Sequence, residues 1–399
     1  MMNRSDFPML GQDIIYFDNG ATTFKPKKVI DSINEYYTNY SANAHRGDYD
    51  ISYKVDLKYE DVRDKVKDFI NANEKEEIIF TSGTTMGLNL VASSFFMKYL
   101  EAGDEVVITK TEHASNVLPW FNLAKKIGIV IKYIDLDSDY HVTVENFKKV
   151  ITNKTKVVSL AFITNVIGDK RPIKEITKIA HENNIFVIVD AAQAIAHTKV
   201  DVKDLDVDFL AFSAHKMYGP TGVGILYGKK ELLEEADPYM LGGGMNESFD
   251  NENEVLLKSL PYKFEAGTQN IAGVIGLGAA IDYINEIGIE NIKVYETKLR
   301  EYLINKLEKI SFIDIINLEA DGAIVSFNID KIFSQDIAYY LNKYNVCVRA
   351  GNHCAKLVKN VTGVTNSVRI SLAFYNTEEE IDEVVELLSD YEKIRNEMI

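Results

Sequence analysis

Three loops of the sequence carry side chains that could do chemistry, and each loop follows an apolar run. The hydroxyls of Thr84 and Thr85 precede an expected helix N-terminus, where free N–H groups can hold a phosphate. A carboxylate, Asp190, ends the second run, and an amine, Lys216, follows the third. Taken singly, each has an ordinary explanation: an N-cap, a helix-capping carboxylate and a solvated surface lysine.

Together, the three loops supply what a pyridoxal phosphate site requires. That cofactor needs a phosphate anchor, a carboxylate that pairs with its protonated ring nitrogen, and a lysine that forms a Schiff base with it. Ser213 and His215 accompany Lys216 in a turn rich in Gly and Pro. A buried environment there favours the neutral amine that Schiff-base chemistry needs. The order of these groups, each after its own strand, predicts this cofactor.

The apolar runs indicate the strands that must position these loops. Several runs are apolar on both faces, which is typical of a parallel sheet covered by helices on each side. Open sheets of this kind bind ligands at the carboxyl ends of their strands. Helices are expected at 84–100 and 173–183. We expect six strands in a doubly wound α/β domain, at 76–83, 104–110, 155–163, 184–190, 207–213 and 222–228.

A second, smaller α+β domain is expected past residue 267, where the pattern changes. Its candidate helices and strands lie at 271–287, 291–310, 323–328 and 346–349. Its last helix opens at Thr377 with Glu380 three residues on, which is a capping-box pattern. We predict a large domain of 16–285 and a small domain of 1–15 and 286–399, with a ligand cleft between them.

The composition excludes several classes of function. The 399 residues include 44 Lys and Arg against 60 Asp and Glu, and the net charge of −16 opposes binding to nucleic acid and to anionic lipid surfaces. Two cysteines, Cys347 and Cys354, are too few for a disulfide framework or a structural zinc site. No apolar stretch approaches the roughly 20 residues of a membrane helix. We therefore expect a cytoplasmic protein that binds no metal, no nucleic acid and no membrane.

Ten segments, spread over nearly the whole chain, resemble the class V aminotransferase family, and specifically its group II, SUF-type cysteine desulfurases. The resemblance implies a pyridoxal phosphate enzyme of fold type I that converts L-cysteine to L-alanine. It also implies a homodimer that passes sulfur to an acceptor or scaffold protein of iron–sulfur cluster assembly. The matching segments are NAHRGDYDIS, FTSGTTMGLNLVASS, TEHASNVLPW, ITNVIGDKRPI, VDAAQAIAH, FSAHKMYGPTGVGILYGK, YMLGGGMN, FEAGTQNIAGVIGLGAA, VRAGNHCA and VRISLAFYNTEEEID.

The resemblance implies a role for each residue that would hold the cofactor. Lys216 would bind it covalently and later shuttle the substrate α-proton, while Asp190 would keep its ring nitrogen protonated. His113 would stack on the ring face, and Gln193 would hydrogen-bond the phenolic oxygen. The phosphate would be held by Thr84, Thr85, Ser213 and His215 of one subunit and by Thr268 of the other.

The resemblance also implies the residues that would bind the substrate. Asn165 and Arg369 would hold its carboxylate, a task that suits the bidentate fork of an arginine. His45 and Arg46, in NAHRG, would line the cleft, and Arg349 would lie close to the reacting sulfur.

The sulfur chemistry would rest on Cys354, which lies in the polar, Gly-containing stretch RAGNHCA. In the family, its thiolate attacks the substrate sulfur and becomes a persulfide. A free cysteine has a pKa of about 8.5, so a cation such as Arg349 or a protonated His353 would favour the thiolate. The alternative for a lone cysteine is a buried small hydrophobe. Cys347, which alternates with apolar neighbours, is interpreted as structural.

The chain departs from the family pattern at several points. Ala114 and Asn352 stand where the family commonly has histidines. The segment CAKLVKNVTGV, which begins at Cys354, lacks the usual Pro, and Asp169 and Lys170 replace small or uncharged residues.

The resemblance leaves alternative functions open. Close alternatives are a selenocysteine lyase and a cysteine sulfinate desulfinase. More distant ones are another class V transaminase or epimerase and a non-catalytic scaffold.

Overall fold

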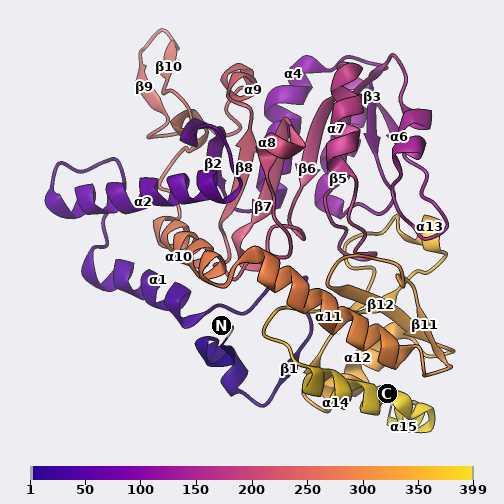
Figure 1. Ribbon diagram of the computed structural model, residues 1–399. Helices are drawn as coiled ribbons and strands as arrows, with labels where there is room; N and C mark the ends of the chain where they lie inside the picture. Colours follow the sequence, from indigo (N-terminus) through magenta and orange to yellow (C-terminus); the bar gives the residue numbers. More distant parts are fainter. Residues whose placement is uncertain (1–2, 398–399) are drawn as a thin grey trace.

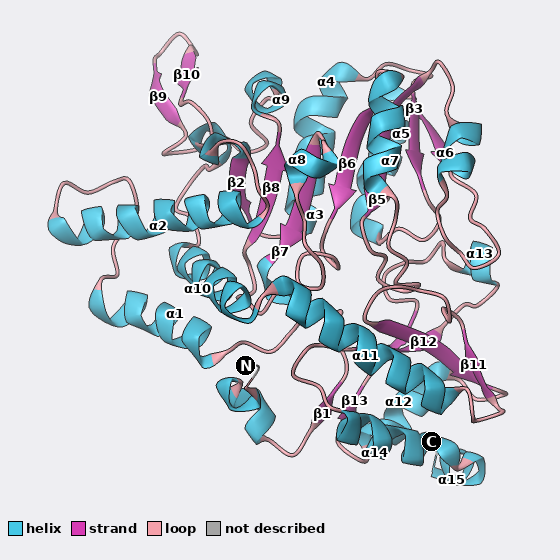
Figure 2. Ribbon diagram, viewed as in Figure 1, coloured by secondary structure: helices cyan, strands magenta, loops and turns pink. Residues whose placement is uncertain are grey.

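The computed structural model describes residues 3–397, and a seven-stranded sheet forms the larger part of it (Figures 1 and 2). The strand order is β2-β8-β7-β6-β5-β3-β4, and within the described residues β8 alone runs against its neighbours. This confirms the predicted mostly parallel, doubly wound α/β fold. The strands are β2 (Ile78–Thr81), β3 (Glu105–Ile108), β4 (Val130–Tyr133), β5 (Thr155–Ala161), β6 (Phe186–Asp190), β7 (Phe209–Ser213) and β8 (Gly224–Gly228).

The six predicted strands form because their side chains are buried on both faces of the sheet. Every residue of β7 and β8 is buried, and β5 and β6 each have only one half-buried residue. The prediction missed β4. This edge strand has one exposed and three half-buried residues, so its sequence VIKY lacks the continuous apolar signature of a central strand.

Helices cover both faces of the large sheet, and each face has its own hydrophobic core. The expected helix at 84–100 forms, but a π-helical turn, η4 (Val91–Phe96), interrupts it. One face is covered by α3 (Thr84–Leu90), η4, α4 (Met97–Tyr99) and α5 (Leu118–Ile127). The other is covered by α1 (Lys27–Asn39), α2 (Asp50–Phe69), α6 (Val144–Val150), α7 (Ile173–Glu182), α8 (Val202–Leu205) and α10 (Ile271–Ile287).

A four-stranded antiparallel sheet with the order β11-β12-β15-β14 lies at the other end of the molecule (Figure 1). Its strands are β11 (Ile313–Ile315), β12 (Ile324–Ile329), β14 (Arg349–Gly351) and β15 (Ser367–Ser371). It packs against α11 (Ile289–Leu307), α12 (Ser334–Asn342), α14 (Glu378–Ser389) and α15 (Tyr391–Glu397). The capping box of Thr377 and Glu380 is present at the start of α14.

The predicted strand at 346–349 is divided into two. Its first part, β13 (Val346–Cys347), pairs with β1 (Ile15–Tyr16) near the N-terminus, and its second part, β14, joins the four-stranded sheet. The N-terminal segment thus lies against the C-terminal sheet. The domain limits of 16–285 and of 1–15 with 286–399 stay a prediction.

The remaining elements are short. Figure 1 shows the hairpin of β9 and β10 projecting from the large sheet. The remaining short elements are η1 (Arg4–Asp6), η2 (Pro8–Gly11), η3 (Lys75–Glu77), η5 (Ala114–Asn116), η6 (Ala214–Lys216), α9 (Lys230–Glu235), β9 (Asn246–Phe249), β10 (Val255–Leu257), η7 (Tyr262–Phe264) and α13 (Lys359–Thr362).

Within residues 3–397, no single helix is long and apolar enough to span a membrane. Only α10 and α11 taken together, with a bend of 74°, reach that length and composition.

The sheet topology brings the predicted loops together. Because β2, β3, β5, β6 and β7 run in the same direction, the loops that follow them leave from one edge of the sheet.

Between β2 and α3, the chain passes close to β8 at Gly224. A Cβ at Gly224 would collide with the Cα of Gly83 and lie 2.6 Å from the carbonyl oxygen of Phe212.

We predict that Gly224→Ala lowers the free energy of unfolding by about 1–3 kcal/mol, because the added methyl group has no space. Gly11→Ala is the matched control, since nothing lies within 4 Å of a Cβ at that position. Urea unfolding of both variants measures the difference. Equal stability of the two variants would contradict the close approach of β8 to Gly83.

Candidate active site

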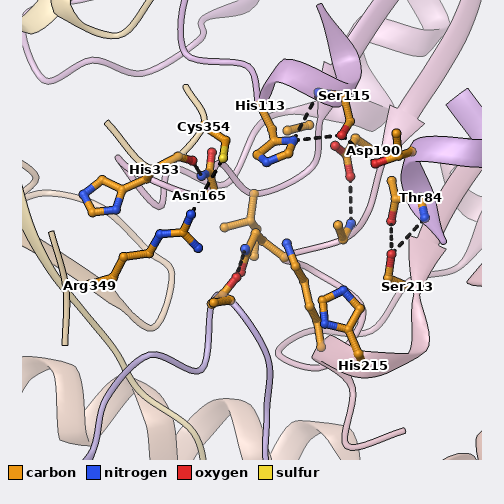
Figure 3. A pocket seen from close by; sticks show the side chains of 18 of the residues that line it. Thr84, His113, Ser115, Asn165, Asp190, Ser213, His215, Arg349, His353 and Cys354 are labelled. Carbon is orange, nitrogen blue, oxygen red and sulfur yellow. Dashed lines mark hydrogen bonds between the residues drawn. The ribbon is translucent and has the colours of Figure 1, made fainter. Parts of the chain in front are cut away.

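A pocket lies between the carboxyl edge of the large sheet and the strands β14 and β15 of the small sheet (Figure 3). Loops that follow β2, β3, β5, β6 and β7 contribute side chains to it. The structure thus brings together most of the site residues predicted from sequence. Those that line the pocket are Thr84, Thr85, His113, Asn165, Asp190, Gln193, Ser213, His215, Lys216, Arg349, Cys354 and Arg369.

Lys216 ends the short 3-10 helix η6, directly after β7. Burial lowers the pKa of its amine to about 8, and the charges of Arg369 and Arg349 act in the same direction, while Asp190 opposes them. An amine with this pKa is half neutral near pH 8. The neutral form is the one that acts as a nucleophile or as a base.

The backbone next to Lys216 is anchored through the carbonyl oxygen of His215. This oxygen accepts hydrogen bonds from the N–H of Thr23 at 3.0 Å, from Thr22 Oγ1 at 3.0 Å and from Lys25 Nζ at 3.2 Å. The donors all belong to the loop between β1 and α1. Sequence reasoning missed this loop, because its Thr and Lys residues carry no signal that distinguishes them from ordinary turn residues.

Asp190 is the last residue of β6 and is 5% exposed. Burial raises the pKa of its carboxyl, while a hydrogen bond from the N–H of Ala192 and the charges of Lys216 and Arg171 act against this. A carboxylate in this position favours a cationic partner in the pocket. The neighbouring Gln193 is held by a hydrogen bond of 2.8 Å from its Nε2 to the carbonyl oxygen of Gly20.

Small hydroxyl side chains gather where α3 begins. Ser213 Oγ accepts a hydrogen bond from the N–H of Thr84 at 2.8 Å and lies 2.7 Å from Thr84 Oγ1. Thr85 Oγ1 lies 2.7 Å from Ser115 Oγ. Burial lowers the pKa of His215 to about 4, so its ring is neutral at pH 7. Hydroxyl groups, a neutral imidazole and the first N–H groups of a helix are suited to holding a phosphate.

His113 begins the turn η5 on the opposite side of the pocket (Figure 3). Its Nδ1 accepts a hydrogen bond from the N–H of Ser115 at 3.1 Å, which assigns the proton of the neutral ring to Nε2. Burial lowers the pKa of His113 to about 4, and the charges of Lys216 and Arg349 add to this effect. A neutral ring in this position can lie flat against an aromatic ligand without adding charge.

Arg369, on β15, supplies the strongest carboxylate-binding group of the pocket and is 1% exposed. Its Nη2 contacts Asp18 Oδ1 at 2.8 Å, and its Nη1 donates to the carbonyl oxygen of Asn165 at 2.9 Å. Arg369 Nε and Asn165 Oδ1 are buried, and neither has a hydrogen-bond partner in the described part of the chain. Because an unsatisfied buried polar atom is costly, a ligand with an acceptor for Arg369 Nε and a donor for Asn165 Oδ1 would remove this cost.

Cys354 is exposed at the mouth of the pocket, and its thiol is free. Arg349 Nη2 lies 3.7 Å from its Sγ, and Figure 3 shows the two side chains facing each other. The departures from the family pattern hold the backbone here. Asn352 Oδ1 accepts a hydrogen bond from the N–H of Cys354 at 3.2 Å. The N–H of Ala114 donates to the carbonyl oxygen of Cys354 at 2.8 Å.

The expectation that a protonated His353 favours the thiolate is wrong. His353 is 3% exposed, and burial lowers its pKa to about 3, with Arg369 and Arg349 adding to the effect. The ring is therefore neutral, and its Nε2 lies 3.0 Å from Ser367 Oγ. Arg349 alone of the two proposed cations can act on the thiol.

Three predicted site residues do not reach this pocket within one chain. His45 and Arg46 line a second cavity, where His45 Nε2 lies 3.2 Å from Glu60 and Arg46 Nη2 donates to the carbonyl oxygen of Gly243 at 2.9 Å. Thr268 lies beside that cavity and accepts a hydrogen bond from Asn43 at 3.3 Å. The expectation that His45 and Arg46 line the same cleft fails for a single chain.

Comparison with known proteins identifies the family. The model of the aminotransferase class-V family matches residues 15–384. A probable cysteine desulfurase of Halalkalibacterium halodurans is 42% identical over 381 residues, covering 94% of each protein. A cysteine desulfurase of Haloferax volcanii is 40% identical over 405 residues, covering 96% of this chain and 95% of the relative. The solved structure of a cysteine desulfurase from Thermococcus onnurineus is 37% identical and superposes with a TM-score of 0.94 over 99% of both chains.

The chain belongs to the aminotransferase class-V family. Cysteine desulfurases are among its relatives and its structural neighbours, and the predicted fold type I architecture is confirmed. Pyridoxal phosphate stays the predicted cofactor.

The pocket fits this cofactor. Asp190, the hydroxyls at the start of α3 and the partly neutral Lys216 all line it, and the buried, unpartnered Arg369 Nε is a donor from which a carboxylate could accept. The individual roles of these residues stay predictions.

We predict that Lys216 titrates near pH 8 in cofactor-free protein, as measured by 13C NMR of reductively methylated lysines. Asp190→Asn should lower this pKa further, because the carboxylate stabilises the charged amine, and Arg349→Met should raise it. The unfolded chain keeps this proton up to about pH 10.5, so the free energy of unfolding should rise between pH 8 and 10.5. A pKa near 10.5 in the folded protein would contradict the burial argument.

Proposed function

We propose that this protein is a pyridoxal phosphate-dependent L-cysteine desulfurase that converts L-cysteine to L-alanine and receives the sulfur on Cys354. Relatives that are 38–42% identical over nearly the whole chain carry this activity in their names, which bears out the prediction from sequence. The single observation that carries the proposal is the free, exposed Cys354 with Arg349 beside its sulfur, at the mouth of a pocket that contains the buried Lys216.

The first task of the pocket is to orient the substrate. Its carboxylate would accept a hydrogen bond from Arg369 Nε, a buried donor without a partner in the described part of the chain, whereas Asn165 Oδ1 is an acceptor and would be available to a donor of the ligand. Asp18 and the carbonyl oxygen of Asn165 hold the guanidinium in place for this contact. The α-carbon of the substrate would then lie near Lys216. The neutral amine of this lysine can take the α-proton and return a proton to the product.

The bound cofactor supplies an electron sink that stabilises negative charge on the substrate next to its α-carbon. Asp190 would preserve this capacity through its negative charge at the ring nitrogen. The protein groups around the pocket do the rest: they exclude water from the α-carbon and hold the sulfur of the substrate within reach of the thiol of Cys354.

Sulfur transfer makes one bond and breaks one bond. A bond forms between Cys354 Sγ and the substrate sulfur, and the bond between the substrate sulfur and Cβ breaks. L-Cysteine and the Cys354 thiol give L-alanine and a Cys354 persulfide, so atoms and electrons balance without an external oxidant. Arg349 Nη2, 3.7 Å from Cys354 Sγ, would help to orient the side chain of Cys354. The exposure of Cys354 leaves the persulfide open to a second protein.

The partners remain part of the proposal. A sulfur acceptor or scaffold of iron–sulfur assembly would take the persulfide sulfur, and the compartment would be the cytoplasm, in which both cysteines stay free thiols. The close alternatives, a selenocysteine lyase or a sulfinate desulfinase, would use the same groups on a related substrate. A transaminase or a non-catalytic scaffold would have no use for a thiol placed beside Arg349.

A homodimer is proposed because the described chain leaves an exposed apolar stripe and a set of predicted site residues outside the pocket. Tyr49, Tyr53 and Leu57 are spaced four residues apart at the start of α2 and along it, and are 57%, 64% and 56% exposed. Thr268 accepts a hydrogen bond from Asn43, which lines the second cavity. A second copy that covers the stripe would bring Thr268 of the partner subunit to the phosphate end of the pocket.

We predict that Cys354→Ser abolishes alanine and persulfide formation from L-cysteine, lowering the rate by at least about 100-fold, because a hydroxyl cannot accept the sulfur. The measurement is alanine quantification together with mass spectrometry of the peptide that contains Cys354, which should gain one sulfur in the wild type. Cys347→Ala is the matched control and should retain activity. Full activity of Cys354→Ser would overturn the persulfide mechanism.

We predict that Leu57→Asp shifts the protein from dimer to monomer in analytical ultracentrifugation, because a charge is placed in the proposed contact. The rate of alanine formation should fall with it, since Thr268 then no longer reaches a pocket. Val294→Asp on α11, where the native side chain is 53% exposed, is the control. A wild-type monomer with full activity would be evidence against the dimer.

A further inference from the structure

A cluster of three buried charges lies behind the pocket and outside the proposed catalytic groups. Glu112 and Asp169 are each 1% exposed, and Arg171 is 2% exposed. Arg171 is thus among the most deeply buried charged residues of the described chain. Asp169 belongs to the part of the sequence that departs from the family pattern. The cluster joins two segments: the loop after β3, which contains Glu112, and the loop between β5 and α7, which contains Asp169 and Arg171.

Arg171 binds both segments through its guanidinium. Its Nη1 pairs with Glu112 Oε1, and its Nη2 donates to Thr109 Oγ1 at 2.9 Å and to Thr111 Oγ1 at 2.7 Å. Its Nε contacts Asp169 Oδ2 at 3.4 Å. All three nitrogens therefore have partners, and these partners lie on two different loops.

The two carboxylates continue the network into the backbone. Glu112 Oε2 accepts hydrogen bonds from Asn116 Nδ2 at 2.8 Å and from the N–H of Ala161, the last residue of β5, at 2.9 Å. Asp169 Oδ1 accepts a hydrogen bond from Thr164 Oγ1. Thr164 Oγ1 in turn accepts one from the N–H of Gly168 at 3.0 Å. Fully partnered buried networks of this kind fix the conformation of the segments that they connect.

The network members are the direct neighbours of two pocket residues. Glu112 immediately precedes His113, and Thr164 immediately precedes Asn165. Both His113 and Asn165 line the pocket, although they come from loops that follow different strands. The relative position of these two side chains therefore depends on the connections between their loops, which Arg171 makes together with the hydrogen bond from the N–H of Ala161 to Glu112.

We propose that Arg171 is a positioning residue for the reaction: its guanidinium ties the His113 loop to the Asn165 loop and so sets the distance between the face of the cofactor and the substrate carboxylate. This inference rests on the proposed function for its kinetic consequences. The tie itself is a property of the chain and can be tested without turnover. Arg171 does not line the pocket and acts only through the loop residues that it binds, which are Thr109, Thr111, Glu112 and Asp169.

Burial makes the tie sensitive to the shape of the side chain as well as to its charge. A lysine in place of Arg171 would keep one positive charge, but it cannot present a planar set of donors to two loops at once. Removing the cation altogether leaves two buried carboxylates without a charged partner, which strongly favours rearrangement of both loops.

The test compares holoenzyme variants Arg171→Met and Arg171→Lys with the wild type, using amide hydrogen exchange and steady-state kinetics. We expect faster exchange in the segments 109–116 and 162–171 in both variants. A misplacement of about 1 Å typically costs about 100-fold, so kcat/KM for L-cysteine should fall by that order in Arg171→Met. In Arg171→Lys it should stay at least about tenfold below the wild type.

A double variant separates the tie from the charge. Asp169→Asn with Arg171→Gln leaves the net charge of the cluster unchanged and removes the guanidinium that joins the loops. The proposal expects this variant to show the same fast exchange and low kcat/KM as Arg171→Met. Recovery to wild-type exchange and kinetics in the double variant or in Arg171→Lys would overturn it.

A stability control excludes a general loss of structure. Leu388→Ala removes a fully buried side chain from α14, in the core of the small sheet. It should lower the melting temperature without faster exchange at 109–116 and 162–171. Loss of protection in these segments to the same extent in Leu388→Ala would also overturn the proposal. If the wild type forms no alanine, the proposed function fails. The hydrogen-exchange comparison would still show whether Arg171 connects the two loops.

Discussion

The burial of positive charge at the end of the large sheet is the constraint on which the site depends. Lys216, Arg349 and Arg369 meet in one pocket, and the carboxylates of Asp18 and Asp190 oppose them from two sides. Burial penalises the charged forms of Lys216, Arg369 and Asp190. Of these groups, the amine of Lys216 most readily becomes neutral, because it can lose its proton near neutral pH, whereas the guanidinium groups remain charged. Burial is therefore the main cause of the reactive neutral amine, and the two fixed cations add to its effect.

The parallel sheet supports this concentration of charge. Lys216 follows β7 and Asp190 ends β6, two central strands that are buried on both faces, so the apolar cores of the sheet provide the rigidity and the loops provide the polar contacts. The small sheet adds Arg369 on β15 and Arg349 on β14, which face each other in the antiparallel register. Two cations on adjacent strands can be tolerated here because Arg369 has Asp18 as its partner and Arg349 lies beside the exposed thiol of Cys354.

The sequence predicted the parts of this arrangement that depend on continuous patterns. The strands β5 to β8 were predicted because full burial leaves apolar runs, and the loops after them were predicted because Asp190 and Lys216 stand at the ends of those runs. The strand β4 escaped prediction because an edge strand is only half-buried. The neutral state of His353 could not be predicted, since the sequence does not reveal that the ring is enclosed. The contact of Asp18 with Arg369 joins residues far apart in the chain and has no local signal.

The position of Cys354 satisfies two demands that conflict in most folds. A sulfur acceptor site must reach a buried reaction centre, yet its product must be accessible to another protein. The chain meets both demands by ending β14 at Gly351 and turning sharply, with positive φ at Gly351, His353 and Cys354 in close succession. This turn places the ring of His353 inside and the thiol of Cys354 outside. The backbone conformation is unfavourable for residues with a Cβ, so it persists only because the buried ring of His353 and the hydrogen bonds of Asn352 and Ala114 hold it. The loop that exposes the sulfur is therefore as dependent on burial as the amine of Lys216.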